Sequence, residues 1–481
     1  MTRLEEIQRR VHSAQALRRP PRTSSTSWTP STPVRKGQKN KRRGVALILV
    51  LGSLVILMVF VTELQQTTSS SISAALAERD AMRAEYNARS AVNLSRLLIA
   101  TEPMVRKAVD PLYRIALKSP APQIPVWKFA DLVLGPFNCP SKAAEFTSVV
   151  GAGIDMGKNL GASQGCFDLK IVDEDAKINL NSAVSGDAAA RDRLGAQLLG
   201  LFGSPQFNEL FEKPDLDGQY SNQPAICGAM LDWADFDEVG YPCDPTQKSN
   251  EGGAEDNYYQ TAGLPYLRKN APFDSLDEVH LIRGVSDDFW ANFVDPNPSN
   301  PEDRVLTVWG QGKVNVNSAN PQTILAVVCS GAPEAPVCVD PEQMGAFLTA
   351  LTLARELTQG APLFKTPKAF VRAMAGKGKG IGPLFSFFGL EPIEFKSPKL
   401  LERAISTESR VFSMVAEGSV SGRKRETRVR MHTVVDFRSA NELGQASEEE
   451  EDAPSAELTP EQIALALASD PMGVIIYHRI E

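Results

Sequence analysis

The sequence predicts an α+β fold in which a long N-terminal helix packs on a small antiparallel sheet, and a large, mainly α-helical domain is inserted between the strands. Three observations predict it. An uncharged apolar run is followed by a stretch without Pro or Gly, which indicates one long helix. Apolar and polar residues alternate near 166–173 and again near 412–437, which indicates strands. Helical spacing dominates the residues between those strands.

The N-terminal helix begins with seventeen residues, Val45–Val61, that include no charged side chain. This is the short end of the length that crosses a bilayer as a transmembrane helix. Residues 1–43 hold 12 Lys and Arg but only two acids, so we expect a cytoplasmic head and a body beyond the membrane. Because Thr62–Ile99 contains neither Pro nor Gly, we expect one helix from Val45 to Ile99, roughly 80 Å long.

Three interpretations compete for the apolar run. A secretory signal peptide needs a small-residue cleavage site directly after the run, but the nearest such site, Ala75–Ala77, comes much later. A plain membrane anchor is the second interpretation. The third is a leader similar to that of type IV prepilins, which is cleaved between Gly44 and Val45 while the apolar helix stays on the mature protein, N-methylated at Val45. The basic residues before Gly44 and the continuous helix after it favour this third interpretation.

Position 49 distinguishes this chain from most pilin-like proteins. The fifth residue after the cleavage site is usually Glu, whose charge costs about 2.5–3.5 kcal/mol at the centre of a membrane helix unless a neighbouring subunit neutralises it. Here the residue is Leu49. A subunit without this acid suits a position at one end of a filament.

Composition limits the function classes. The chain has 51 Lys and Arg against 58 Asp and Glu, a net charge of -7, which argues against a dedicated nucleic-acid binder. The four His residues are scattered, so a His-based metal or catalytic centre is disfavoured. The sequence shows no nucleophile beside a base and no phosphate-cradling glycine motif. We therefore expect no enzyme activity.

The body follows the helix in a definite order. Six prolines between 102 and 137 predict short helices and loops. Cys166–Asp173 reads as a strand, and the string at 177–183 recurs at 313–319 as Asn-x-Asn-Ser-Ala. We expect each copy to be a short strand whose Asn or Ser caps the next helix. A hairpin is expected near the end, with its turn at Gly418–Arg425, then a helix over Ile463–Ala468 and a last strand at Val474–Tyr477.

These patterns divide the chain into six segments. They are a basic leader (1–44), a transmembrane helix (45–61), the first part of a pilin-like domain (62–183), an inserted α-helical domain (184–405), a returning β-hairpin of the pilin-like domain (406–438), and an acidic linker with a C-terminal tail (439–481).

The chain resembles the general secretion pathway protein K family, the large minor pseudopilins of type II secretion systems. The resemblance rests on Gly44-Val45 with Leu49, on the paired Asn-x-Asn-Ser-Ala strings, and on two central strings, Leu231–Asp237 and Gly253–Tyr259. It implies a single-pass inner-membrane protein with a large periplasmic domain. It also implies a role in protein transport at the tip of the pseudopilus, in complex with the I and J minor pseudopilins. The inner-membrane secretion platform and the prepilin peptidase are further implied partners.

The six cysteines all follow the apolar helix and therefore lie on its oxidising side. Fifteen pairings into three disulfides are possible. We favour pairing between sequence neighbours, because each such pair closes a loop rich in Pro or Gly. The expected pairs are Cys139–Cys166, Cys227–Cys243 and Cys329–Cys338.

The two central strings carry a candidate metal site. Its residues are Asp232, Asp235, Asp237, Glu255 and Asp256. Oxygen ligands without His or Cys suit Ca²⁺, and the family resemblance also implies calcium in the inserted domain. The spacing is not that of an EF-hand loop. Carboxylates that cap helices or face solvent are the equally weighted alternative.

A function of another class also fits part of the sequence. Short helical units containing Asn-x-Asn-Ser-Ala resemble helix-hairpin-helix modules, which would make the protein a membrane-anchored DNA-uptake receptor. Such a receptor needs basic hairpin loops, whereas residues 44–481 carry a net charge of -17. We therefore rank this alternative below the pseudopilin and expect no nucleic-acid partner.

Overall fold

The computed structural model describes residues 43–139, 165–184, 187–212, 214, 218, 220–243, 257–358, 360–377, 382–422, 425–441 and 470–480. The chain divides into two compact units, residues 1–73 and residues 74–481, and the second is called the body below. Residues 1–42 of the expected leader (1–44) and the expected helix over Ile463–Ala468 lie outside the described residues.

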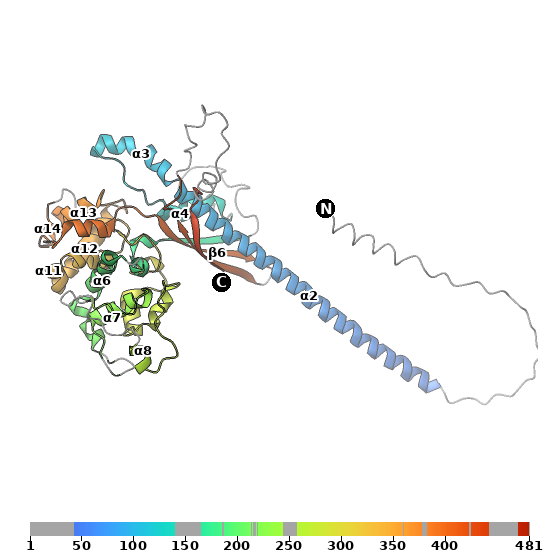
Figure 1. Cartoon of the computed structure of the whole chain (residues 1–481). Coiled ribbons are helices and arrows are strands. Elements are labelled where there is room, and N and C mark those ends of the chain that lie inside the picture. The colour runs from blue at the N-terminus through green and yellow to red at the C-terminus, as the bar shows by residue number, and fades with distance from the viewer. Residues whose placement is uncertain are drawn as a thin grey trace, which may run out of the picture. The chain divides into compact units, whose positions relative to one another are not determined.

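The predicted N-terminal helix is confirmed as α2, one helix of 58 residues from Arg43 to Ala100 (Figure 1). Before Ser73 its apolar side chains are exposed, as Leu47 and Phe60 show. This helix is long and apolar enough to cross a membrane. Its exposure is what a bilayer-facing helix requires, because no protein side chain of the described residues covers it.

The body contains the predicted small antiparallel sheet. Its four strands are β1 (Cys166–Asp173), β6 (Val411–Ser421), β7 (Glu426–Asp436) and β8 (Val474–Ile480), in the order β1-β6-β7-β8. One expectation needs correction: the turn is shorter than Gly418–Arg425, because β6 continues to Ser421. The expected last strand at Val474–Tyr477 is confirmed as β8, which pairs along β7 and completes the sheet.

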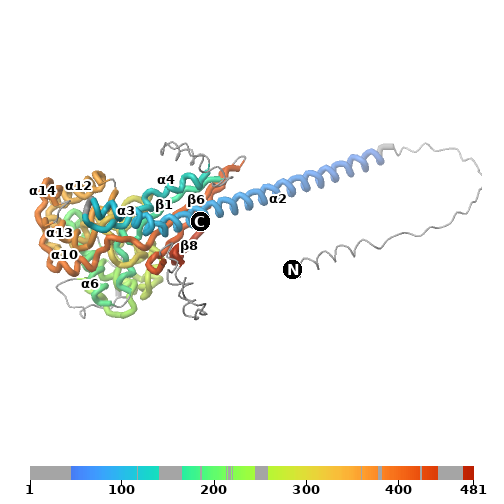
Figure 2. The backbone as a smooth tube through the Cα atoms, turned by 90° about the horizontal axis from the view of Figure 1, so that it is seen from above, coloured from blue at the N-terminus to red at the C-terminus, as the bar shows by residue number. Residues whose placement is uncertain are grey.

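The last part of α2 packs across one face of this sheet (Figures 1 and 2). Its small residues Ala84, Ala88 and Ala91 have no exposed surface. They face Gly418 of β6, where an added Cβ would stand 1.9 Å from the carbonyl oxygen of Ala84. The helix backbone therefore lies directly on the strand, and only glycine fits at this crossing.

The segment after α2 differs partly from the expected short helices and loops. It holds α3 (Glu102–Leu117), η1 (Val126–Phe129), α4 (Ala130–Leu134) and η2 (Gly135–Phe137). Helix α3 is longer than predicted. Pro103 stands at its start, where a missing N–H is tolerated, and the helix also accommodates Pro111 within it.

The inserted domain is mainly helical, as predicted. Its helices are η3 (Glu174–Ala176), η4 (Leu180–Ala183), α6 (Ala188–Phe202), η5 (Pro205–Phe211), α7 (Gln223–Ala234), α8 (Asn257–Thr261), η6 (Leu276–Leu281), α9 (Asp287–Phe289), η7 (Trp290–Val294), η8 (Pro301–Asp303), α10 (Pro321–Gly331), α11 (Pro336–Val339), α12 (Pro341–Leu357), α13 (Pro367–Met374), α14 (Gly382–Phe387) and α15 (Pro398–Ala404). Its short strands are β2 (Ile178–Asn179), β3 (Leu306–Thr307), β4 (Val314–Asn315) and β5 (Ile405–Ser406).

The inserted domain is built from two repeats, residues 178–308 and residues 314–407, each starting at one of the paired strings. In the first repeat β2 pairs in parallel with β3, and in the second β4 pairs in parallel with β5. The amide of Asn181 donates to the carbonyls of Phe273 and Val308 and accepts from the N–H of Phe273. Asn317 makes the same three bonds with Phe364 and Thr407. Each string thus ties the start of its repeat to the middle and the end.

The expected capping role of the strings is confirmed for the first string. Asn179 is the N-cap of η4, the next helix, and its side chain accepts a hydrogen bond from the N–H of Asn181. Asn315 accepts the equivalent hydrogen bond from the N–H of Asn317. The longer helices α6 and α10, which come later, are capped by other residues, Asp187 and Asn320.

Candidate functional site

The predicted processing junction lies where the described chain begins. Gly44 and Val45 belong to the first turn of α2, and Val45 is 60% exposed. The basic residues that precede Arg43 lie outside the described residues. The junction therefore stays a prediction from the sequence.

The aspartates of the first central string gather at the end of α7. Asp232 lies in its last turn and accepts a hydrogen bond from the N–H of Tyr241 at 2.7 Å. Asp235 and Asp237 both face Arg191 of α6, at 3.5 Å and 3.0 Å. Helix α7 ends at Ala234, so the chain turns there and brings these carboxylates to one end of the helix.

Asp235 carries the strongest sign of a missing partner. The residue is 4% exposed, yet neither carboxylate oxygen accepts a hydrogen bond. Burial and the charge of Asp237 raise the pKa of Asp235. Burial also raises the pKa of Asp232, to about 8. The charges of Arg191 and Arg268 act against these shifts, so three carboxylates face two cations at this end of α7. A group of oxygen ligands with an excess of acids is the kind of surrounding that suits a hard cation.

The ligand set is not complete within the residues described. No group of three or more His, Cys, Asp or Glu side chains in those ranges is arranged to hold a metal ion. Glu255 and Asp256, the two remaining candidates, lie outside the described residues. The structure thus brings Asp232, Asp235 and Asp237 together at the end of α7, and the metal site itself stays a prediction.

The three disulfides are those expected from the sequence. Cys139–Cys166 joins the segment after η2 to the first residue of β1. Cys227–Cys243 ties α7 to the segment beyond its acidic end, and Cys329–Cys338 ties α10 to α11. Each bond fixes a local loop, which limits how far these segments can separate in the unfolded chain.

A polar junction connects the sheet to the inserted domain, and the sequence analysis missed it. Strand β1 ends in Asp173 and continues directly into Glu174 and Asp175, all three of which are buried. A carboxylate is buried only when it is hydrogen-bonded or paired. Three consecutive acids between the apolar residues Val172 and Ala176 are the signal that could have revealed the junction.

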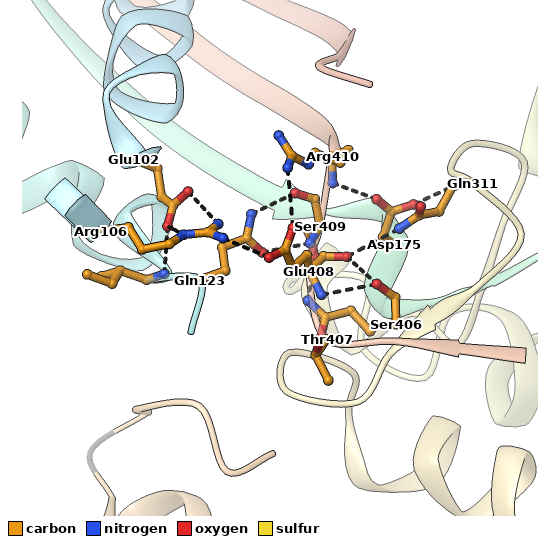
Figure 3. A network of polar contacts seen from close by, with 12 residues as sticks. Glu102, Arg106, Gln123, Asp175, Gln311, Ser406, Thr407, Glu408, Ser409 and Arg410 are labelled. Carbon is orange, nitrogen blue, oxygen red and sulfur yellow. Dashed lines mark hydrogen bonds and ion pairs between the residues drawn. The ribbon is translucent and has the colours of Figure 1, made fainter. Parts of the chain in front are cut away.

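Asp175 holds both connections of the inserted domain (Figure 3). One of its oxygens accepts from the N–H of Gln311, between the two repeats, at 2.8 Å. The other accepts from the N–H groups of Arg410 and Val411, where the chain re-enters the sheet, at 2.7 Å and 3.1 Å. Asp175 itself lies where the chain leaves the sheet. Its carboxylate therefore binds both the connection between the two repeats and the segment where the chain returns to the sheet.

The neighbouring acids complete the junction. Asp173 accepts from the hydroxyls of Ser318 and Ser409. Glu174 accepts from the Lys177 ammonium at 3.1 Å and from the Thr307 hydroxyl. Both repeats thus reach the same turn after β1, which argues for a fixed connection rather than a hinge.

A second layer of the junction surrounds Arg106 of α3 (Figure 3). Its guanidinium donates to both oxygens of Glu102 and to Glu408 at 2.7 Å. Gln123 exchanges two hydrogen bonds with the backbone of Ser409, at 2.7 Å and 2.8 Å. Helix α3 and the loop after it therefore hold the segment that leads into β6.

Burial changes the acidity of the junction. It raises the pKa of Asp173 to about 6, against the hydrogen bonds from Ser318 and Ser409. Burial, together with the charge of Asp173, raises the pKa of Asp175 to about 7. Burial acts in the same direction on Glu174, but the Lys177 ammonium and the hydroxyls of Thr307 and Ser413 together outweigh it and lower the pKa of that carboxyl. The junction is thus sensitive to pH near neutrality.

One contact at the junction has the residue types of a hydrolytic pair. The Ser413 hydroxyl lies 3.0 Å from Nε2 of His432. Ser413 is 3% exposed and also bonds Glu174. A nucleophile must reach its substrate, so we interpret this pair as part of the packing.

Comparison with known proteins shows what part of the chain is similar to. Residues 176–294, from the junction through the first repeat, match the family model "Type II secretion system (T2SS), protein K". This part of the chain is therefore similar to type II secretion system protein K. The matched residues include the acidic end of α7 and the contact of Asn181 with Phe273.

Two relatives show how far the similarity extends. Type II secretion system protein K of Aeromonas hydrophila is 26% identical over 165 residues, which are 34% of this chain and 41% of that protein. The match thus spans less than half of the relative's length. The crystal structure of the GspK-GspI-GspJ complex from the enterotoxigenic Escherichia coli type 2 secretion system is similar at 13% identity and a TM-score of 0.44, over 85% of this chain and 99% of that chain.

Proposed function

We propose that this protein is a minor pseudopilin of a type II secretion system, located at the tip of the periplasmic pseudopilus. There it would support export of proteins across the outer membrane, without enzyme activity of its own. The protein K match of the first repeat carries this proposal. The exposed apolar part of α2 supports anchoring in the inner membrane before assembly. Leu49, in place of the usual acid, supports a terminal position in the filament.

The proposed partners are the I and J minor pseudopilins, the inner-membrane secretion platform and the prepilin peptidase. The peptidase would cleave between Gly44 and Val45, and methylation of Val45 would follow. The rigid junction around Asp175 supports this role, because a tip subunit must keep its domains in a fixed arrangement while the filament moves.

Calcium is proposed as a structural ion at the end of α7. Asp232, Asp235 and Asp237 would supply oxygen ligands, with Glu255 and Asp256 as further candidates. A bound Ca²⁺ would balance the buried negative charge there and stabilise the turn after α7. The two buried oxygens of Asp235, which accept no hydrogen bond, support this assignment.

Co-purification tests the proposed function. The full-length chain is co-expressed with the I and J minor pseudopilins of the same secretion system, and detergent extracts are purified through a tag on the J subunit. We expect the three proteins to elute together in equal amounts. Elution of I and J without this chain, while all three are expressed and folded, would contradict the proposal.

A further inference from the structure

The two repeats of the inserted domain differ sharply in charge. Residues 178–308 contain 22 Asp and Glu but 8 Lys and Arg, a net charge of -14. Residues 314–407 contain 7 acids and 9 bases, a net charge of +2. The repeats share the same Asn-centred contacts, so the fold does not impose this contrast.

Matched positions show the contrast most clearly. Asn181 and Asn317 bind the backbone of Phe273 and Phe364, which makes these two residues equivalent. Counted from them, Asp274 and Asp277 of the first repeat correspond to Lys365 and Lys368 of the second. The same structural positions thus accept either sign of charge.

Four of the nine Lys and Arg residues of the second repeat lie on two helices that contact each other, α13 and α15. Lys368 and Arg372 are one turn apart on α13, and Lys399 and Arg403 are one turn apart on α15. All four side chains are exposed, and none has an ion pair in the part of the chain that the structure describes. We call these four residues the basic face.

The positions of the two lysines do not favour the helices. Lys368 and Lys399 are the second residues of α13 and α15. Free N–H groups make the first turn of a helix positive, so cations are disfavoured there and acids are favoured. Helix stability therefore gives no reason for these lysines, whereas an external negative partner does.

The surroundings of the basic face indicate what kind of polyanion it suits. Glu402 lies on α15 beside Arg403, and the exposed Glu394 precedes the same helix. These carboxylates would repel a continuous phosphate backbone. A protein surface can complement a mixed pattern of charges, because it can place Lys opposite the carboxylates and Asp or Glu opposite the cations.

We propose that the basic face of the second repeat docks an acidic surface of a partner protein. This inference rests on the proposed function in one respect, because it expects that the chain works within a protein assembly. The four cations would raise the rate of encounter and orient the partner, and the interaction would weaken with salt.

Charge reversal of the two lysines tests the basic face. The chain from Val45 onward, which lacks the strongly basic residues 1–43, is titrated in detergent micelles with fluorescent poly-L-glutamate and, separately, with a fluorescent DNA duplex, at low and at physiological salt. The test variant is Lys368→Asp with Lys399→Glu, which places acids where helix N-termini favour them. The control variant is Lys313→Asp with Arg430→Glu, two exposed residues outside the basic face.

We expect the wild type and the control variant to bind poly-L-glutamate in a salt-dependent manner, and the test variant to bind about tenfold more weakly. Thermal unfolding should show that the test variant is folded. Equal binding by the test and control variants would overturn the proposal. So would tighter binding of DNA than of poly-L-glutamate that is lost in the test variant. Because no pseudopilin is present, the result is independent of the co-purification test.

Discussion

Replacing Gly418 by Ala should separate α2 from the sheet on which it packs. The Ala Cβ would stand 1.9 Å from the carbonyl oxygen of Ala84 and 2.7 Å from the N–H nitrogen of Ala88. Both are backbone atoms of α2, so no side-chain rotation can relieve the contact. The helix would have to withdraw by about 1.5 Å to restore an ordinary van der Waals contact of about 3.4 Å.

The cost follows from that displacement. Overpacking in a well-packed core destabilises by about 1–3 kcal/mol. The rigid backbone of α2 places Gly418→Ala at the upper end, about 2–3 kcal/mol. The helix would also lose contacts of Ala84, Ala88 and Ala91, which are fully buried against the sheet.

A matched variant controls for the change of residue type. Gly345 lies in α12, and an added Cβ there meets nothing within 4 Å. Gly345→Ala should stabilise the body by about 0.5–1 kcal/mol, because Ala is the better helix former. The two variants therefore should shift stability in opposite directions.

Urea unfolding followed by hydrogen exchange measures both effects. Gly418→Ala should lower the urea midpoint and speed exchange of β6 and β7 amides, while amides of α10 and α12 in the inserted domain keep their protection. If Gly418→Ala unfolds at the wild-type urea concentration with unchanged β6 protection, then the direct backbone contact argued here is wrong.

Three further predictions concern other parts of the chain. Gly44→Asp should leave the basic head attached, because cleavage requires a small residue there, and N-terminal sequencing should read Val45 first only in the wild type. Added Ca²⁺ should raise the unfolding temperature of the wild type but not of Asp235→Asn, and an equal rise in both would exclude Asp235 as a ligand. Burial raises the pKa of Asp173 to about 6 from its ordinary 3.8, so the native state holds this proton more tightly and its contribution to stability is lost as pH rises from about 4 to 6. Asp173→Asn should therefore reduce the loss of stability between pH 4 and pH 7 by about 2–3 kcal/mol in urea titrations, and an unchanged slope would contradict the buried charge.

The sequence was sufficient where structure depends on residues close together along the chain. Val45–Val61 contains no charged residue, and Thr62–Ile99 contains neither Pro nor Gly. The local sequence is therefore sufficient to predict α2. The alternation in β1, β6 and β7 follows in the same way, because side chains point to opposite faces at every second residue. The disulfide pairs could also be predicted, because each joins the nearest cysteines.

Long-range contacts decided the remainder. Nothing near Val474 shows that β8 pairs with β7, since the linker at 442–469 separates them in sequence. The paired strings revealed a repeat, but only the folded structure shows that Asn181 and Asn317 bind the middle and the end of each repeat.

The junction illustrates the physical reason. The pattern of Asp173 to Asp175 fixes only that three acids follow a strand, and in sequence such acids usually mean a solvated turn. Their burial depends on donors that come from Gln311, Ser318 and Arg410, more than 130 residues away. A buried carboxylate is stable only where such donors converge. Local sequence thus determined the elements of this protein, and tertiary structure decided which polar groups hold the inserted domain on the sheet.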